Sequence, residues 1–175
     1  MRVLCLDLSL TRTGVADSAA PTEPFVLAPP SKVGRSWGRI HWMRQRVQEL
    51  LDGADVLVCE GYAYHSATNA VAAGELGGVV KYLAYCMGVP VVDIAPAPLK
   101  KVATGKGNAK KGAVLAEAIR RLGYTGYDDN EADAMFLLQA AAHHYDLPCR
   151  VGLPKAHTST LAKVAWPALE GMEAA

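Results

Sequence analysis

Three acidic residues stand where an ionised side chain is costly, and together they could carry metal-dependent chemistry. Asp7 interrupts an apolar run, Glu60 follows the apolar stretch Val-Leu-Val-Cys, and Asp133 lies between two alanines inside a predicted helix. An unpaired carboxylate in such surroundings costs several kcal/mol unless something neutralises it. For Asp7 taken alone, the capping of a turn is an equally good explanation.

These acids meet if the first and fourth predicted strands are parallel neighbours. Both strand-end side chains then lie at one edge of the sheet, which is where open α/β sheets hold ligands. Carboxylates that meet cannot all stay ionised without a counter-ion. Oxygen ligands without a His or Cys cluster favour Mg²⁺, with Mn²⁺ as a substitute. Two such ions could activate a water and stabilise the leaving 3′ oxygen of a phosphodiester, so that hydrolysis leaves a 5′ phosphate.

The acidic start of the last predicted helix offers further ligands. Asp129, Asn130 and Asp133 lie on one face, because residues three and four apart are neighbours on a helix. Helix capping and the helix dipole give Asp128 and Asp129 a purely structural explanation. That explanation does not extend to Asp133, which lies inside the helix.

The elements that position these residues follow from hydrophobic periodicity. The pattern predicts three antiparallel strands, then helix, strand, helix, strand and two helices. This order is typical of an α/β fold, here a five-stranded mixed sheet with helices on both faces. A turn is expected at the Pro-flanked residues 95–98. The expected strands are 2–10, 15–18, 25–28, 55–60 and 89–94, and the expected helices are 36–51, 69–87, 111–122 and 129–145.

Length and composition indicate one soluble domain. The chain has 175 residues, of which 51% are hydrophobic, enough for a continuous core. We expect the domain to span residues 1–148, followed by a tail at 149–175 whose weak periodicity allows some mobility. The four cysteines form no C-x-x-C pair and are expected to be reduced thiols. No signal peptide or membrane span is recognisable, so a cytoplasmic protein without a membrane partner is expected.

A basic stretch contrasts with the nearly neutral chain. The net charge is only +1, yet residues 100–111 contain five lysines and no acid. A solvated surface loop is one explanation of such a run. Contact with DNA phosphates is the explanation that we prefer. The candidate DNA-binding residues are Lys100, Lys101, Lys106, Lys110 and Lys111.

Three motifs in combination resemble the RuvC branch of the RNase H-like superfamily. They are D-L-S-L-T-x-T-G at 7–14, V-C-E-G at 58–61 and N-E-A-D-A at 130–134, and the resemblance covers about residues 2–145. It implies an RNase H-like nuclease domain in which the catalytic metal ligands are Asp7, Glu60 and Asp133. It also implies basic residues near the scissile phosphate, at the positions of Lys100 and Lys111.

One position departs from that family. Three residues before the final Asp, where relatives usually have Asp or His, this sequence has Asn130. An Asn carbonyl can bind a metal but brings no charge. We therefore expect Asp129 to act as the fourth ligand and catalytic carboxylate, with Asn130 as the alternative. If neither binds, the second metal would be held weakly and the preference would shift towards Mn²⁺.

Two aromatic residues follow the second acid. Tyr62 and Tyr64 lie in a region where relatives carry an aromatic side chain that enters the centre of a four-way DNA junction. Both are therefore candidates for stacking on an unpaired base. An ordinary half-buried aromatic is as good an explanation for either residue.

The resemblance implies an endonuclease that resolves Holliday (four-way) junctions as a homodimer, with symmetric nicks in opposing strands. Close packing through Gly74, Gly77 and Gly78 makes the helix at 69–87 the expected dimer contact. A phage-like enzyme that also cuts flaps and other branched DNA has the same features. A non-catalytic RNase H-like nucleic-acid-binding module would have no reason to gather three acids. The first motif also resembles the phosphate loop of actin-like and sugar-kinase ATPases, which need roughly twice this length.

Overall fold

Five strands form one mixed sheet in the computed structural model, which describes residues 1–61 and 67–169. The strand order is β3-β2-β1-β4-β5. The first three strands are antiparallel neighbours and β1 runs parallel to β4, as the sequence predicts. The fifth strand, β5, also runs parallel to β4. The strands are β1 (Val3–Asp7), β2 (Thr13–Asp17), β3 (Phe25–Leu27), β4 (Val56–Glu60) and β5 (Val91–Ile94).

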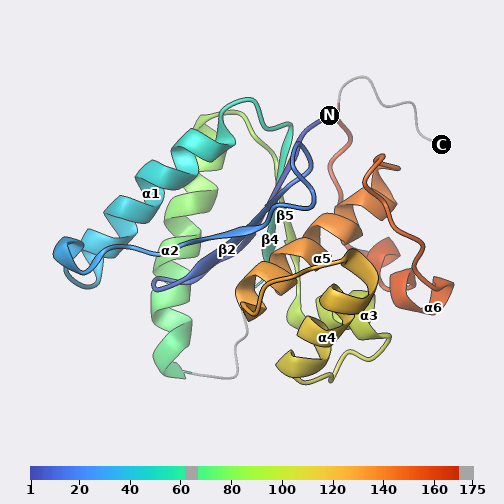
Figure 1. Ribbon diagram of the computed structural model, residues 1–175. Helices are drawn as coiled ribbons and strands as arrows, with labels where there is room; N and C mark the ends of the chain where they lie inside the picture. Colours follow the sequence, from blue (N-terminus) through green and yellow to red (C-terminus); the bar gives the residue numbers. More distant parts are fainter. Residues whose placement is uncertain (62–66, 170–175) are drawn as a thin grey trace.

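Helices cover both faces of this sheet (Figure 1), which confirms the predicted architecture. One face is covered by α1 (Trp37–Leu51) and α2 (Ala67–Cys86). The other is covered by α3 (Pro96–Thr104), α4 (Lys111–Leu122) and α5 (Asp129–His144). Short helical turns complete the described part: η1 (Ser31–Val33), α6 (Lys155–Thr158) and η2 (Leu161–Lys163).

The central strands divide their side chains between the two faces. In β1, Leu4 and Leu6 pack towards α1 and α2, whereas Val3 and Cys5 pack towards α5, because successive strand residues point to opposite faces. All four side chains are fully buried, which explains the nearly continuous hydrophobic run. The next residue, Asp7, therefore belongs to the α5 face.

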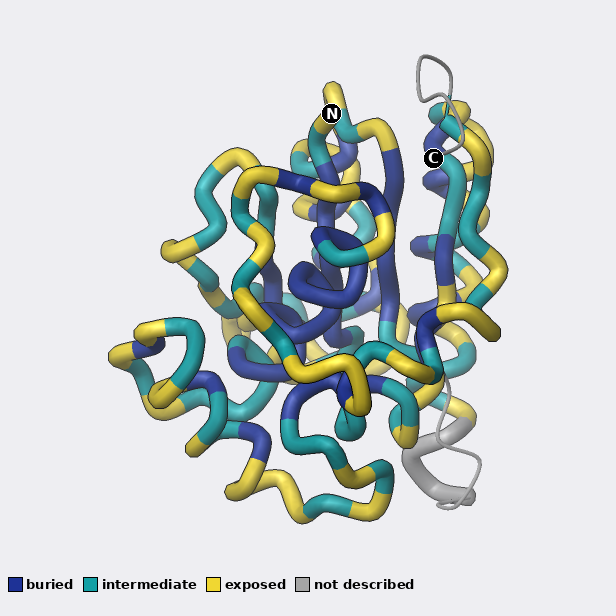
Figure 2. The backbone as a smooth tube through the Cα atoms, turned by 90° about the vertical axis from the view of Figure 1, so that its right-hand side faces the viewer, coloured by how far each residue is buried: buried dark blue, intermediate teal, exposed yellow. Residues whose placement is uncertain are grey.

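The helix α5 forms the centre of one layer. All of its residues from Ala132 to Ala142 are buried, because the sheet, α3, α4 and the C-terminal segment surround it. Figure 2 shows the buried residues gathered at the middle of the molecule. A helix that is buried all round is expected to be apolar. Asp133 is therefore an exception that needs a chemical reason.

One helix is absent from the sequence-based prediction. A turn is expected at residues 95–98, and this prediction is wrong, because α3 begins at Pro96. Proline suits the first helical position, where its missing N–H group would have no partner in any case. Gly105 ends the helix with a φ of +78°. Lys100 and Lys101 thus lie on a helix rather than in a loop.

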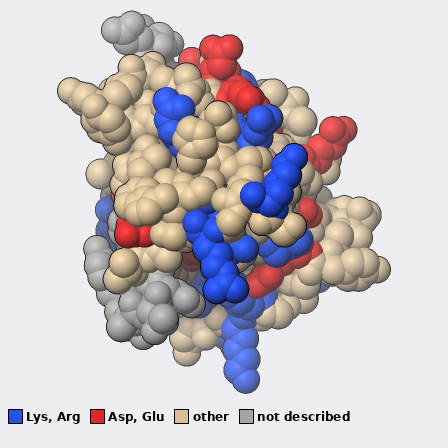
Figure 3. Space-filling model, turned by 90° about the vertical axis from the view of Figure 1, so that its left-hand side faces the viewer, with Lys and Arg blue, Asp and Glu red and all other residues tan. Residues whose placement is uncertain are grey.

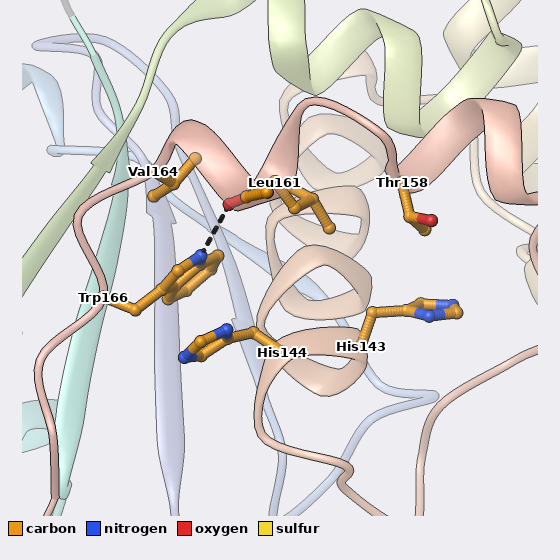
Figure 4. A pocket seen from close by; sticks show the side chains of 7 residues that line it. His143, His144, Thr158, Leu161, Val164 and Trp166 are labelled. Carbon is orange, nitrogen blue, oxygen red and sulfur yellow. Dashed lines mark hydrogen bonds between the residues drawn. The ribbon is translucent and has the colours of Figure 1, made fainter. Parts of the chain in front are cut away.

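The segment that follows α5 packs back on it. Trp166 stacks on His144 with ring centroids 4.5 Å apart, and its indole nitrogen donates a hydrogen bond to the Leu161 carbonyl oxygen at 3.0 Å (Figure 4). These residues line a pocket of about 480 Å³ together with His143, whose ring nitrogen lies 2.9 Å from the Val151 carbonyl oxygen. The boundary at residue 148 stays a prediction. In the described ranges no helix is both long and apolar enough to cross a membrane.

Candidate active site

Two of the acids end neighbouring parallel strands. The register of β1 and β4 pairs Leu6 with Cys59, so Asp7 and Glu60 are the next residues of their strands at the same edge of the sheet. The parallel pairing that sequence analysis requires is therefore confirmed. Glu60 also shares the face of Asp7, because Val58, two residues earlier, packs on the α5 side.

The start of α5 is tied to the turn between β1 and β2. Asp128 caps the helix by accepting a hydrogen bond from the backbone nitrogen of Asn130 at 2.9 Å. The same side chain forms an ion pair with Arg12, which lies in the β1–β2 turn. A helix cap and a strand turn thus share one carboxylate, so the elements that carry Asp7 and Asp133 are fixed relative to one another.

The three acids line a single pocket of about 300 Å³. Asp7 is 8% exposed and Asp133 is 9% exposed, and the side chain of Glu60 reaches the same cavity from β4. The structure also brings three other predicted site residues to this pocket: Lys100, Lys111 and Asn130.

Asp7 and Glu60 each affect the pKa of the other. Burial, and then the charge of Glu60, raises the pKa of Asp7 well above its ordinary value. Burial also raises the pKa of Glu60, although a hydrogen bond from Asp7 partly offsets this effect. Like-charged carboxylates that line one pocket do not both stay ionised there without a proton or a counter-ion.

Asp133 adds a third charge to the same space. Burial, and then the charge of Asp7, raises the pKa of Asp133 to about 7. The charges of Lys111 and Lys100 oppose this rise without cancelling it. The pocket therefore retains an excess of negative charge that favours a proton or a cation.

No group of three or more Asp, Glu, His or Cys side chains in the described ranges is arranged to hold a metal ion as it stands.

The structure distinguishes Asp129 from Asn130. Asn130 lines the pocket, and its amide nitrogen donates to Asp128 at 2.9 Å, which leaves its carbonyl oxygen available. Asp129 is not among the lining residues, and its carboxylate binds the amino group of Lys111 at 2.7 Å. Its charge nevertheless reaches the pocket, since it raises the pKa of both Asp7 and Asp133. The identity of the fourth ligand stays a prediction.

The remaining predicted DNA-binding residues lie outside the pocket. Lys101 is half-buried on α3, while Lys106 and Lys110 are exposed in the connection between α3 and α4. This connection joins the two helices that carry the pocket lysines. Tyr62 and Tyr64 lie outside the described residues.

Sequence reasoning missed two positioning residues, Arg12 in the β1–β2 turn and Thr13 at the start of β2. Thr13 is fully buried, and its hydroxyl accepts a hydrogen bond from the Ser9 nitrogen at 3.0 Å and donates one to the Ser9 carbonyl oxygen at 2.8 Å. Arg12 reaches Asp128 from the same turn. The T-x-T-G pattern signals a constrained turn, but the partner of Arg12 lies 116 residues away and no local signal indicates it.

Comparison with curated proteins found relatives named RuvC. Crossover junction endodeoxyribonuclease RuvC of Leifsonia xyli is 30% identical over 178 residues, covering 96% of this chain and 83% of that protein. The RuvC protein of Halorhodospira halophila is 27% identical over 161 residues, covering 84% and 93%. That of Anaeromyxobacter dehalogenans is 32% identical over 103 residues, and there the chain spans 56% of the relative's length. No family model matches the chain.

Solved structures give the same result for the fold. A structure of Thermus thermophilus RuvC superposes with a TM-score of 0.64 at 22% identity, covering 84% of this chain and 98% of that one. The T. thermophilus RuvC in complex with Holliday junction substrate gives a TM-score of 0.65 at 23% identity, covering 86% and 95%. This likeness establishes an RNase H-like fold, as the motifs indicate.

Proposed function

The chain belongs to the RuvC family of crossover junction endodeoxyribonucleases, and from this premise we propose that it resolves four-way DNA junctions by hydrolysing phosphodiester bonds. The observation that carries the proposal is the meeting of Asp7, Glu60 and Asp133 in one pocket beside two lysines. A non-catalytic binding module has no use for three carboxylates that line one pocket and whose pKa values are all raised.

The donor set fits divalent metal ions with a preference for hard oxygen ligands. Asp7, Glu60 and Asp133 would hold Mg²⁺ or Mn²⁺, with Asn130 on the pocket wall or Asp129 beside it as a further ligand. Among the residues that the structure describes, no His or Cys side chain lines this pocket. Bound ions would neutralise the charge that otherwise demands a proton and lower the pKa of a water molecule that attacks the phosphate.

The lysines supply the complementary part of the mechanism. Lys100 and Lys111 line the pocket with the acids, so their amino groups can bind the non-bridging oxygens of the scissile phosphate and stabilise the charge that develops there. The contact between Lys111 and Asp129 holds the amino group in place before substrate arrives. Cleavage on the 3′ oxygen side leaves a 5′ phosphate.

Symmetric cleavage of a four-way junction requires two active sites, and α2 is our candidate for the dimer contact. Its outer side carries Tyr82 and Tyr85, which are 69% and 79% exposed. Gly78 is exposed and Gly74 has open space beside it, whereas Gly77 is buried within the protomer. The glycine contact predicted from the sequence is therefore reduced to Gly74 and Gly78. A face with large exposed aromatics beside small residues is typical of a self-complementary interface.

Within the family, we place the chain in a phage-like branch with a broader preference for branched DNA. Asn130 and the net charge of +1 support this assignment. The relatives reported above come from bacteria. The proposed location is the cytoplasm, which the free thiols of Cys5 and Cys59 support.

The test compares synthetic four-way, flap and linear DNA in the presence of Mg²⁺. We expect the native protein to nick the four-way and flap substrates, and the Asp7→Asn variant to bind them without cutting. Equal cleavage by both proteins would remove Asp7 from the mechanism. Cleavage of linear DNA at the same rate as of branched DNA would contradict structural selectivity.

A further inference from the structure

A second basic surface lies on α1 and on the segment that leads into it, outside the pocket described above. From residue 24 to residue 48 the sequence contains no acid. Figure 3 shows Lys and Arg side chains gathered on the face of the molecule that α1 covers. We call this the α1 basic surface, and it consists of Lys32, Arg35, Arg39, Arg44 and Arg46.

Most of these charges have no carboxylate partner. Among residues 1–61 and 67–169, Arg46 forms a salt bridge with Glu49 at 2.9 Å, and the other four cations form none. Arg39 donates to the Gly34 carbonyl oxygen at 3.2 Å, which holds its guanidinium beside the turn that precedes α1. Unpaired like charges along one segment create a positive field suited to a polyanion.

An exposed aromatic accompanies these cations. Trp37, the first residue of α1, is 64% exposed, between Arg35 and Arg39 in sequence. Cations interleaved with an aromatic side chain are typical of nucleic-acid contacts. An anionic membrane is the competing polyanion, but a membrane-surface helix needs a free apolar face. The apolar face of α1, which includes Ile40 and Met43, is already buried in the core.

The α1 basic surface begins at the end of the sheet where the pocket lies. Asp7 pairs with Gly14, and the neighbouring residue Thr13 pairs with Leu27 at the end of β3. The chain therefore leaves the sheet at the edge that carries Asp7 and passes through η1 into α1, on the face opposite α5. A duplex that leaves the pocket across this edge meets the cations at the start of α1.

We propose that the α1 basic surface binds the phosphate backbone of a DNA arm that extends beyond the active site. This inference rests on the proposed function, since it concerns an arm of the same branched substrate. It predicts that affinity depends on arm length, because a short arm ends before it reaches α1.

The experiment measures binding by fluorescence anisotropy in EDTA, which removes the divalent metal and so prevents cleavage. Four-way junctions have arms of about one helical turn (10 base pairs) or about two turns (20 base pairs). The Lys32→Gln/Arg35→Gln variant is compared with wild type and with Lys155→Gln/Lys163→Gln. The control pair is also exposed and removes the same charge, and it lies in the C-terminal segment, on the opposite side from α1 (Figure 1).

We expect the Lys32→Gln/Arg35→Gln variant to lose about 10-fold in affinity for the long-armed junction and less than about 3-fold for the short-armed one. Loss of two phosphate contacts also lowers the salt dependence, the slope of log K against log salt, by about 2. The control variant stays within about 2-fold of wild type for both substrates. Equal losses with long and short arms, or equal losses by both variants, would overturn the inference.

Two further measurements separate this inference from its premise. Wild-type protein that cuts branched DNA but shows no arm-length dependence would overturn the arm contact while leaving the proposed function intact. Vesicles that contain phosphatidylserine test the competing partner. If the variant loses vesicle binding and keeps DNA binding, the surface serves a membrane and the inference is wrong.

Discussion

Gly14 in β2 lies so close to Asn130 in α5 that no side chain fits between them. A Cβ atom built on Gly14 would overlap the carbonyl group of Asn130 and lie 3.0 Å from the backbone nitrogen of Glu131. Gly14 is also the residue that pairs with Asp7 across the sheet. The absence of a side chain at one position therefore sets the depth at which the first turn of α5, and with it Asp133, approaches Asp7.

Replacement of Gly14 by alanine should displace α5 from the sheet. We expect Gly14→Ala to lower the free energy of unfolding by about 1–3 kcal/mol, as other overpacked sites do, and to abolish cleavage. Urea denaturation and the junction assay measure the two effects. Gly112→Ala is the matched control, since a Cβ there meets no atom within 4 Å and alanine favours a helix. Gly14→Ala protein with normal stability and activity would show that this close approach has no role.

Arg12 should act as a positioning residue through Asp128. Arg12→Ala removes the ion pair between the β1–β2 turn and the cap of α5, so Asp133 loses its alignment with Asp7. We expect kcat to fall about 10-fold or more, since small misplacements of catalytic groups are costly, while KM changes little. Arg150→Ala, which removes the pair between Arg150 and Asp146, should leave both constants unchanged. A change in KM alone would instead indicate that Arg12 contacts DNA.

The stability of the metal-free protein should fall as the pH rises. Burial, and then the charge of Asp7, raises the pKa of Asp133 to about 7, whereas an unfolded Asp titrates near about 3.9. The folded state therefore holds its proton more tightly, and stability is lost as the pH rises from about 4 to about 7. Asp133→Asn removes this loss and should raise the free energy of unfolding at pH 8 in EDTA by about 1–3 kcal/mol. Denaturation at pH 4, where the variant and wild type should be alike, is the internal control.

Lys111 should contribute to catalysis, and its neighbour should not. Lys111→Gln removes a cation that lines the pocket and opposes the charge of three acids. We expect kcat to fall by about 10²–10³, as for other groups that stabilise charge in a transition state. Lys110→Gln removes the same charge from an exposed position outside the pocket. Equal losses in both variants would mean that the lysines act through the overall field alone.

The dimer contact on α2 can be tested without DNA. Tyr82→Arg places a charge in the middle of the proposed interface, opposite its own copy across a two-fold axis. We expect the variant to sediment as a monomer at concentrations where the wild type is a dimer, and to cut the two opposing strands independently. Tyr127→Arg, at an even more exposed tyrosine, is the control and should not change the sedimentation. A wild-type protein that sediments as a monomer at all concentrations contradicts the proposal.

The sequence by itself was sufficient to indicate the two strand-end acids and the sheet that carries them. Asp7 and Glu60 each follow an apolar run of strand length, and the cost of an ion there is a local property. Parallel pairing of their strands follows from the alternation of strands and helices. Element type and order were thus predictable for every strand and for every long helix except α3, whose N-terminal prolines suit a turn as well as a first helical position.

Only the tertiary structure decided which side chains at the site meet. The sequence gives Asp129 and Asn130, neighbours in one helix turn, equal access to a pocket. In the structure Asp129 pairs with Lys111, whereas Asn130 lines the cavity. The link between Arg12 and Asp128 and the approach of Gly14 to Asn130 join segments more than a hundred residues apart. Hydrophobic periodicity indicates which face of each segment is buried. Which side chains contact one another depends on how separate elements pack, and that packing is a property of the whole chain.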